Sequence, residues 1–139
     1  MRRLSAEPGF VRGALCAGAA QIVLSALGAG IVAALVSGSS VGAGDADGVA
    51  IALGALSMFV TAALSGAFGV SQAATLGAPT RRVARLAGTT GAAAVAALLA
   101  LASLSALPAP GMALVDMAFG VAGAALGSAL LARRLHEVA

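Results

Sequence analysis

The chain has 139 residues, of which 60% are hydrophobic and only 9% are charged, and its mean hydropathy is +1.05. Soluble domains carry about 25% charged residues, so this composition excludes an ordinary water-facing surface and predicts an integral membrane protein. The formal net charge of +3 does not indicate nucleic-acid binding, because Trp and Tyr are absent and the basic residues lie at the ends of apolar segments.

Four apolar segments follow one another along the chain, and each has at least the roughly 20 residues needed to cross a bilayer. We expect an all-α membrane protein, a compact bundle of four transmembrane helices in a single domain over residues 1–139. Strands are not expected, because no segment alternates apolar and polar residues. The predicted spans cover residues 13–36, 49–71, 86–107 and 111–132.

The connections between these spans differ in composition. Segment 37–48 is rich in Gly, Ser and Asp and predicts a polar loop. Pro79 interrupts the chain between the second and third spans. The sequence LPAP at 107–110 allows only a tight turn, and Pro110 suits the first turn of the fourth helix.

All basic residues are arginines, and they lie before the first span, between the second and third, and after the fourth. They are Arg2, Arg3, Arg12, Arg81, Arg82, Arg85, Arg133 and Arg134. Four crossings put these groups on one side and Asp45 and Asp47 on the other. Because arginines are retained on the cytoplasmic side, we expect both termini inside. The expected cytoplasmic basic surface comprises Arg81, Arg82, Arg85, Arg133 and Arg134.

Each span carries a row of small or polar residues at helical spacing. In a bilayer, small residues let helices approach closely and polar side chains hydrogen-bond between helices. In the fourth span one face comprises Ala113, Asp116, Gly120, Gly123 and Gly127. The opposite face, expected toward lipid, carries Leu114, Val121 and Leu126. The expected helix-packing glycines are Gly18, Gly28, Gly54, Gly120, Gly123 and Gly127.

Asp116 is the one acidic residue inside a predicted span, roughly 8 Å from the outer end of its helix. No arginine shares that level, and its expected neighbours are the hydroxyls of Ser37, Ser103 and Ser105. Three interpretations stay open: the carboxylate reaches water, it hydrogen-bonds hydroxyls across the bundle, or it exchanges a proton or binds a cation during transport. The possible polar or ion site comprises Asp116, Gln21, Ser25, Thr61 and Ser65.

The chain carries no catalytic constellation, because it has no paired carboxylates and its single Cys and His, Cys16 and His136, lie far apart in sequence. We expect no enzyme activity, no cofactor and no metal. The bias toward Ala, Gly and Arg without Lys is typical of a GC-rich bacterial genome, so we expect a multi-pass protein of the bacterial cytoplasmic (inner) membrane.

Two functions remain open. The favoured one is a non-catalytic accessory or assembly subunit that packs against a larger membrane complex. The alternative is a small homo-oligomeric transporter or channel that uses Asp116, for a proton- or cation-coupled process or a small solute. The expected partners are the lipid bilayer and another membrane protein or a second copy of the chain, and not nucleic acid.

The layout of four spans, both ends inside and a basic middle loop is similar to that of the ATP-synthase protein I family. That resemblance implies an accessory role in assembly. Small multidrug-type exporters also have four short helices, but they carry an essential acid in the first span, where this chain has only Gln21. Bacterial fluoride channels share the size, but this chain lacks their asparagine.

Overall fold

The computed structural model of the chain describes residues 8–38, 43–76, 78, 80–103 and 110–137. The four helices are α1 (Pro8–Gly38), α2 (Ala43–Thr75), α3 (Arg81–Ala102) and α4 (Pro110–Glu137). Each helix is long and apolar enough to cross a membrane. The prediction of an all-helical chain with four such helices is confirmed.

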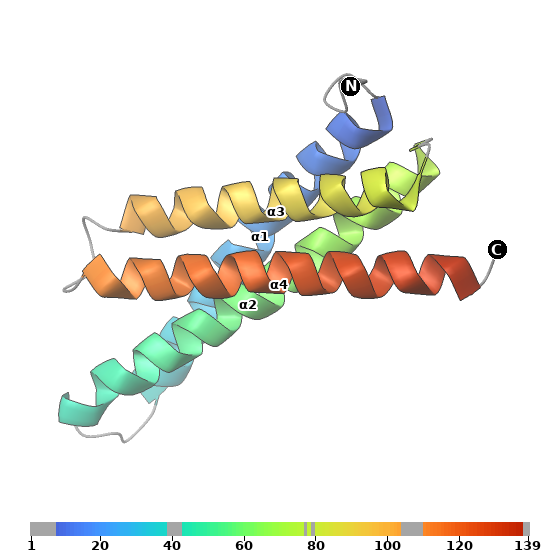
Figure 1. The fold of residues 1–139 in the computed structure, drawn as a ribbon. Helices are drawn as coiled ribbons and strands as arrows, with labels where there is room; N and C mark the ends of the chain where they lie inside the picture. Colours follow the sequence, from blue (N-terminus) through green and yellow to red (C-terminus); the bar gives the residue numbers. More distant parts are fainter. Residues whose placement is uncertain (1–7, 39–42, 77, 79, 104–109, 138–139) are drawn as a thin grey trace.

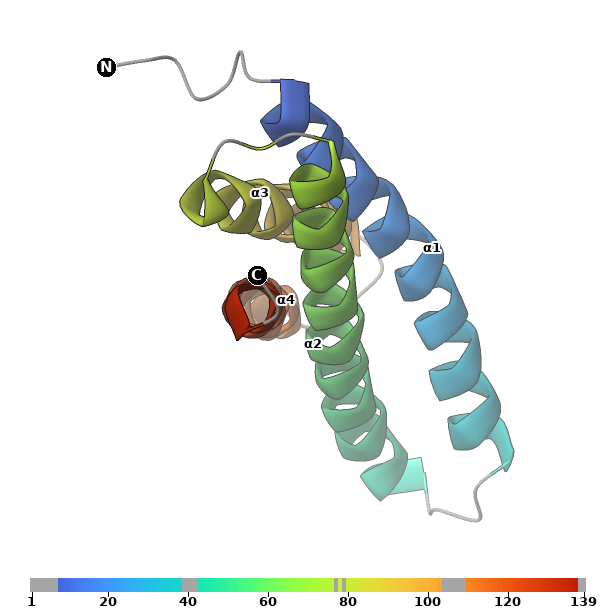
Figure 2. The same ribbon diagram turned by 90° about the vertical axis from the view of Figure 1, so that its right-hand side faces the viewer.

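The helices form two antiparallel pairs that lie across one another. α1 and α2 make one pair, and the pair of α3 and α4 crosses it obliquely (Figures 1 and 2). α2 packs against all three other helices, whereas α1 and α4 barely touch. α2 is therefore the central helix of the bundle.

The first two helices are longer than their predicted spans. α1 begins at Pro8, a residue suited to the first turn because its missing N–H would have no partner there. α2 begins at Ala43, so the loop predicted over 37–48 is too long. Asp45 and Asp47 therefore belong to α2 and not to the loop.

The last two helices also differ from prediction at their ends. α3 begins earlier because Thr80 caps it: the Thr80 side chain accepts a hydrogen bond from the Val83 N–H at 3.3 Å. α4 begins at Pro110, which confirms the predicted first-turn proline, and it extends past its predicted end to Glu137. The predicted end of the third span, residue 107, lies outside the described residues.

One end of the bundle carries the described arginines. The starts of α1 and α3 and the ends of α2 and α4 meet at this end (Figure 1). The arginines there, all exposed, are Arg12, Arg81, Arg82, Arg85, Arg133 and Arg134. We call it the arginine end. Arg2 and Arg3 lie outside the described residues.

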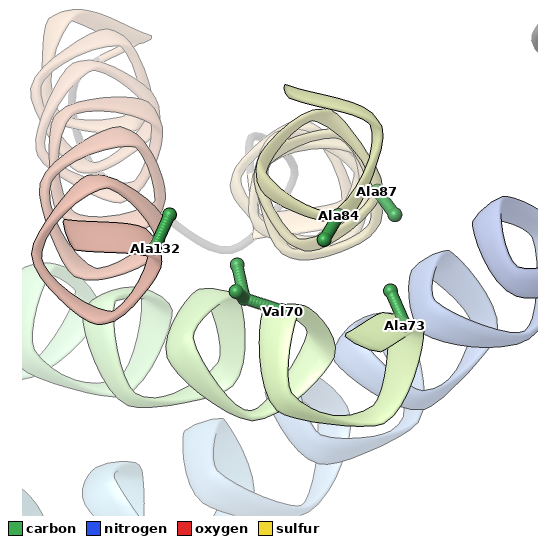
Figure 3. Packing of buried hydrophobic residues seen from close by; sticks show 5 residues of the cluster. All are labelled: Val70, Ala73, Ala84, Ala87 and Ala132. Atoms are coloured by element: carbon green, nitrogen blue, oxygen red, sulfur yellow. The ribbon is translucent and has the colours of Figure 1, made fainter. Parts of the chain in front are cut away.

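Small side chains fill the interior, where the buried hydrophobic residues of the described ranges are alanines apart from Val70 and Val83. Near the arginine end, α2, α3 and α4 enclose an apolar cluster (Figure 3). Its buried members are Val70, Ala73, Ala84, Ala87 and Ala132. Because alanine side chains are short, the helix backbones approach one another closely, as is typical of helices that associate within a bilayer.

Candidate functional site

The glycines of α4 lie directly on its neighbours. A Cβ added at Gly123 would overlap the backbone carbonyl of Phe59, and one added at Gly127 would overlap the carbonyl of Ala63. A Cβ at Gly120 would lie 2.7 Å from the Cβ of Ala96 in α3. The predicted small-residue face of α4 therefore packs mainly on α2, with α3 beside it.

The other three predicted packing glycines differ from one another. A Cβ at Gly18 would lie 3.1 Å from Val95 Cγ2 in α3, and Gly28 lies against the Ser57 hydroxyl of α2. The prediction that Gly54 packs against another helix is wrong, because an added Cβ there would meet no atom within 4 Å. Gly54 lines a cavity instead of a helix contact.

Close contacts also involve five further glycines, of which Gly69 and Gly88 belong to the predicted rows of small residues in the second and third spans. They are Gly13, Gly66, Gly69, Gly88 and Gly91. Three helices meet at Gly69 of α2: an added Cβ would lie 2.5 Å from the Ala17 Cβ, 2.9 Å from the Gly13 carbonyl oxygen and 2.9 Å from the Gly88 Cα. These residues are small, as the predicted ones are, but nothing in the sequence shows which helix each one faces.

A group of polar side chains lies in the middle of the bundle. The Gln21 side chain is fully buried, and its Nε2 donates to Ser25 Oγ at 2.9 Å and to Thr61 Oγ1 at 3.3 Å. It also contacts Met58 Sδ at 3.5 Å. Ser65 Oγ donates to the Thr61 carbonyl oxygen at 2.7 Å. The structure thus brings Gln21, Ser25, Thr61 and Ser65 together, and we call these four residues the polar cluster.

Two buried polar atoms lack a hydrogen-bond partner within the described part of the chain, namely Oε1 of Gln21 in the polar cluster and Oγ of Ser128 in α4. A buried group left in this state costs about 1–3 kcal/mol. Ser128 is a buried polar residue that the sequence pattern did not indicate, although it follows Gly127 directly. The centre of the bundle is therefore polar and incompletely satisfied.

Asp116 lines a cavity next to the polar cluster. The cavity has a volume of about 490 Å³, and its walls come from α1, α2 and α4. Its polar lining comprises Ser25, Ser37, Ser57, Thr61 and Asp116, and the rest of the wall is apolar. A second hollow of about 190 Å³ adjoins Asp116 on the side of Ile51 and Met112. We call the larger space the Asp116 cavity.

Three serines were expected beside Asp116: one lines the same cavity, one does not, and one lies outside the described residues. Ser37 lines the Asp116 cavity. Ser103 does not, and its hydroxyl donates to the Ala100 carbonyl oxygen at 2.7 Å. Ser105 lies outside the described residues. Asp116 is partly buried, and no group in the described ranges donates a hydrogen bond to its carboxylate.

Nothing among the described residues gathers three or more His, Cys, Asp or Glu side chains into a group able to hold a metal ion. No family model, curated protein or solved structure matches this chain. The candidate site is therefore defined by three features of the structure. They are the buried polar cluster, the Asp116 cavity, and the apolar cluster toward the arginine end.

Proposed function

We propose that the chain is a multi-pass protein of the bacterial inner membrane with both termini in the cytoplasm. Four helices are long and apolar enough to cross a bilayer. The described arginines lie at one end of the bundle, in the first turns of α1 and α3 and in the last turns of α4. Because arginine-rich ends are retained in the cytoplasm, this charge distribution supports the proposed orientation.

We further propose that this protein is a non-catalytic accessory or assembly subunit of a larger membrane complex. The observation that carries this proposal is that the polar interior does not continue to the arginine end. Beyond Ser65 and Ser128, the space between α2, α3 and α4 is filled by the apolar cluster that includes Val70 and Ala87. Ion or proton movement needs polar groups along the whole path, so this arrangement favours a role without transport.

The exposure of α1 supports a partner outside the chain. In the most apolar 18-residue stretch of α1 only 6% of residues are buried, whereas the figure for the corresponding stretch of α3 is 39%. From Ile22 to Gly38 no residue of α1 is buried, and Leu27 and Ile31 are 60% and 61% exposed. This half of α1 covers only the first part of α2, so it is the surface that a larger complex would contact.

Gentle extraction followed by native mass measurement tests this proposal. A photo-crosslinking residue at Leu27 should give a discrete adduct with a different protein, and the mass of the extracted particle should not be a whole-number multiple of the mass of this chain. The matched control is the same residue at Leu126, which is 47% exposed on the opposite side of α4 from its packing glycines. A particle made only of copies of this chain would contradict an accessory role.

The second candidate is a small transporter or channel, and the Asp116 cavity is the observation that favours it. A carboxylate beside several hydroxyls inside an apolar bundle is a common element of proton and cation pathways. Proteoliposome flux measurements separate the two candidates.

A further inference from the structure

We propose that the Asp116 cavity binds an ammonium group attached to a hydrocarbon body, with Asp116 as its counter-ion and the neighbouring hydroxyls as hydrogen-bond acceptors. This site goes beyond the accessory function proposed above and does not depend on it. It requires no transport step, because the ligand enters and leaves the cavity from the same side.

The charge of Asp116 is uncompensated within the described part of the chain. The described arginines lie at the arginine end, whereas Asp116 lies in the second turn of α4, near the opposite end. A carboxylate beside hydrocarbon is costly unless it is paired or neutralised. A cationic ligand would supply the missing partner.

The surrounding groups favour an ammonium over a metal ion. Calcium and magnesium need six or more oxygen ligands, usually with more than one carboxylate or several waters, and among the described residues that line this cavity Asp116 is the only one with a carboxylate. An ammonium group donates up to three hydrogen bonds, so it needs fewer oxygen atoms around it than these metal ions do. Beyond the carboxylate, Ser25 of α1 and Ser57 of α2 also line this cavity and can offer hydroxyl oxygens.

The shape of the cavity favours a ligand with an elongated apolar part. Its α1 wall runs over residues 25–37, which cover about 18 Å at about 1.5 Å per residue. Between the two serines at its ends, this wall is made of apolar side chains such as Val32 and Val36. Pockets for small ligands have volumes of about 300–1,000 Å³, and this cavity falls within that range.

Access from the bilayer follows from the helix arrangement. The cavity has walls from both α1 and α4, and these two helices barely touch. Because α2 lines the cavity between them, we infer that a ligand enters between α1 and α4. Gly54 of α2 faces this space together with Asp116, and an added Cβ there would meet nothing within 4 Å.

Two sources could supply this chemistry, the headgroup of an aminophospholipid or a free amphipathic amine, and two measurements on the purified full chain distinguish them. In the first, nanodiscs of phosphatidylglycerol alone are compared with nanodiscs of phosphatidylglycerol and phosphatidylethanolamine in equal parts, and lipid retention is read by native mass spectrometry. In the second, octylammonium chloride is titrated onto the protein in neutral detergent and its dissociation constant is measured.

Two kinds of variant test the carboxylate charge of Asp116 and the open volume of the Asp116 cavity separately. Asp116→Asn removes the counter-ion while keeping size. Gly54→Leu fills the cavity, and Gly54→Val does the same with a smaller side chain if the first variant fails to fold. Gly30→Leu is the matched control, because Gly30 is exposed on α1 and an added Cβ there also meets no atom within 4 Å.

The wild type should retain phosphatidylethanolamine or bind octylammonium, and Asp116→Asn and the Gly54 variants should weaken that binding at least tenfold while Gly30→Leu preserves it. Retention of the lipid alone assigns the headgroup, and binding of octylammonium alone assigns a soluble amine. Absence of both, equal binding by wild type and Asp116→Asn, or equal loss in Gly30→Leu would overturn the proposal.

Discussion

Gly123 of α4 lies so close to Phe59 of α2 that an added Cβ would overlap the Phe59 carbonyl group. Gly127, one turn further along α4, has the same relationship to Ala63. The two contacts place the backbones of α2 and α4 against each other at the point where the helix pairs cross. Because hydrocarbon gives helices no hydrophobic reason to associate, close packing of this kind is what holds such a bundle together.

Gly123→Leu should therefore lower the free energy of unfolding by about 1–3 kcal/mol or more, as overpacking does in well-packed interiors. The control is Val121→Leu, because Val121 is 43% exposed and faces away from α2, so its enlargement should be nearly silent. Thermal unfolding of both variants in the same detergent gives the comparison. Equal stability would mean that the wrong face of α4 has been placed inside.

Gly54→Ala and Gly127→Ala should act in opposite directions. At Gly54 the added methyl group meets no atom, so the higher helix propensity of alanine should raise stability by up to about 1 kcal/mol. At Gly127 the same methyl group would overlap the Ala63 carbonyl, so stability should fall. A melting temperature for Gly54→Ala as low as that of Gly127→Ala would argue against the open space beside Asp116.

Gln21→Met should cost no more than about 1 kcal/mol, although Gln21 is fully buried and joins α1 to α2. Hydrogen bonds between membrane helices are worth about 0.6 kcal/mol on average, and the substitution also removes the unpartnered Oε1. Methionine keeps an unbranched chain of similar length, so it should leave no large void. Equilibrium unfolding in mixed micelles measures the difference, and a loss of several kcal/mol would show that the polar cluster is a major source of stability.

A phosphatase that is active only outside the cytoplasm should be inactive when fused after Ala139. The reason is that the end of α4 belongs to the arginine end, which we place in the cytoplasm. A green fluorescent protein fused at the same position should fluoresce. An active phosphatase with a dark fluorescent fusion would invert the proposed orientation.

The number and positions of the helices could be predicted because hydropathy and chain breaks are local properties. Pro110 marks the start of α4 directly. The starts of α2 and α3 were harder to predict, because Asp45, Asp47 and the arginines after Thr80 are polar but compatible with a helix that continues beyond the hydrocarbon. Hydropathy reports where lipid begins, and helices do not have to end there.

The candidate site could be predicted only in part. Small and polar residues at helical spacing identify the inward face of each helix, and this is why the residues of the polar cluster meet. Which helices become neighbours depends on the crossing of the two pairs, and no local pattern encodes it. The predicted helix contact of Gly54 is therefore wrong, and Ser103, predicted beside Asp116, hydrogen-bonds within α3 instead.

Proton and cation flux through proteoliposomes separates an accessory subunit, which carries out no transport, from a transporter that uses Asp116. Purified wild type and Asp116→Asn would be reconstituted at equal density and subjected to a pH gradient and to a potassium gradient. We predict that both variants fold and that neither passes protons or cations above protein-free vesicles, because the polar interior stops at the apolar cluster around Val70. A pH-dependent flux in the wild type that is lost in Asp116→Asn would contradict the accessory role and establish a transporter.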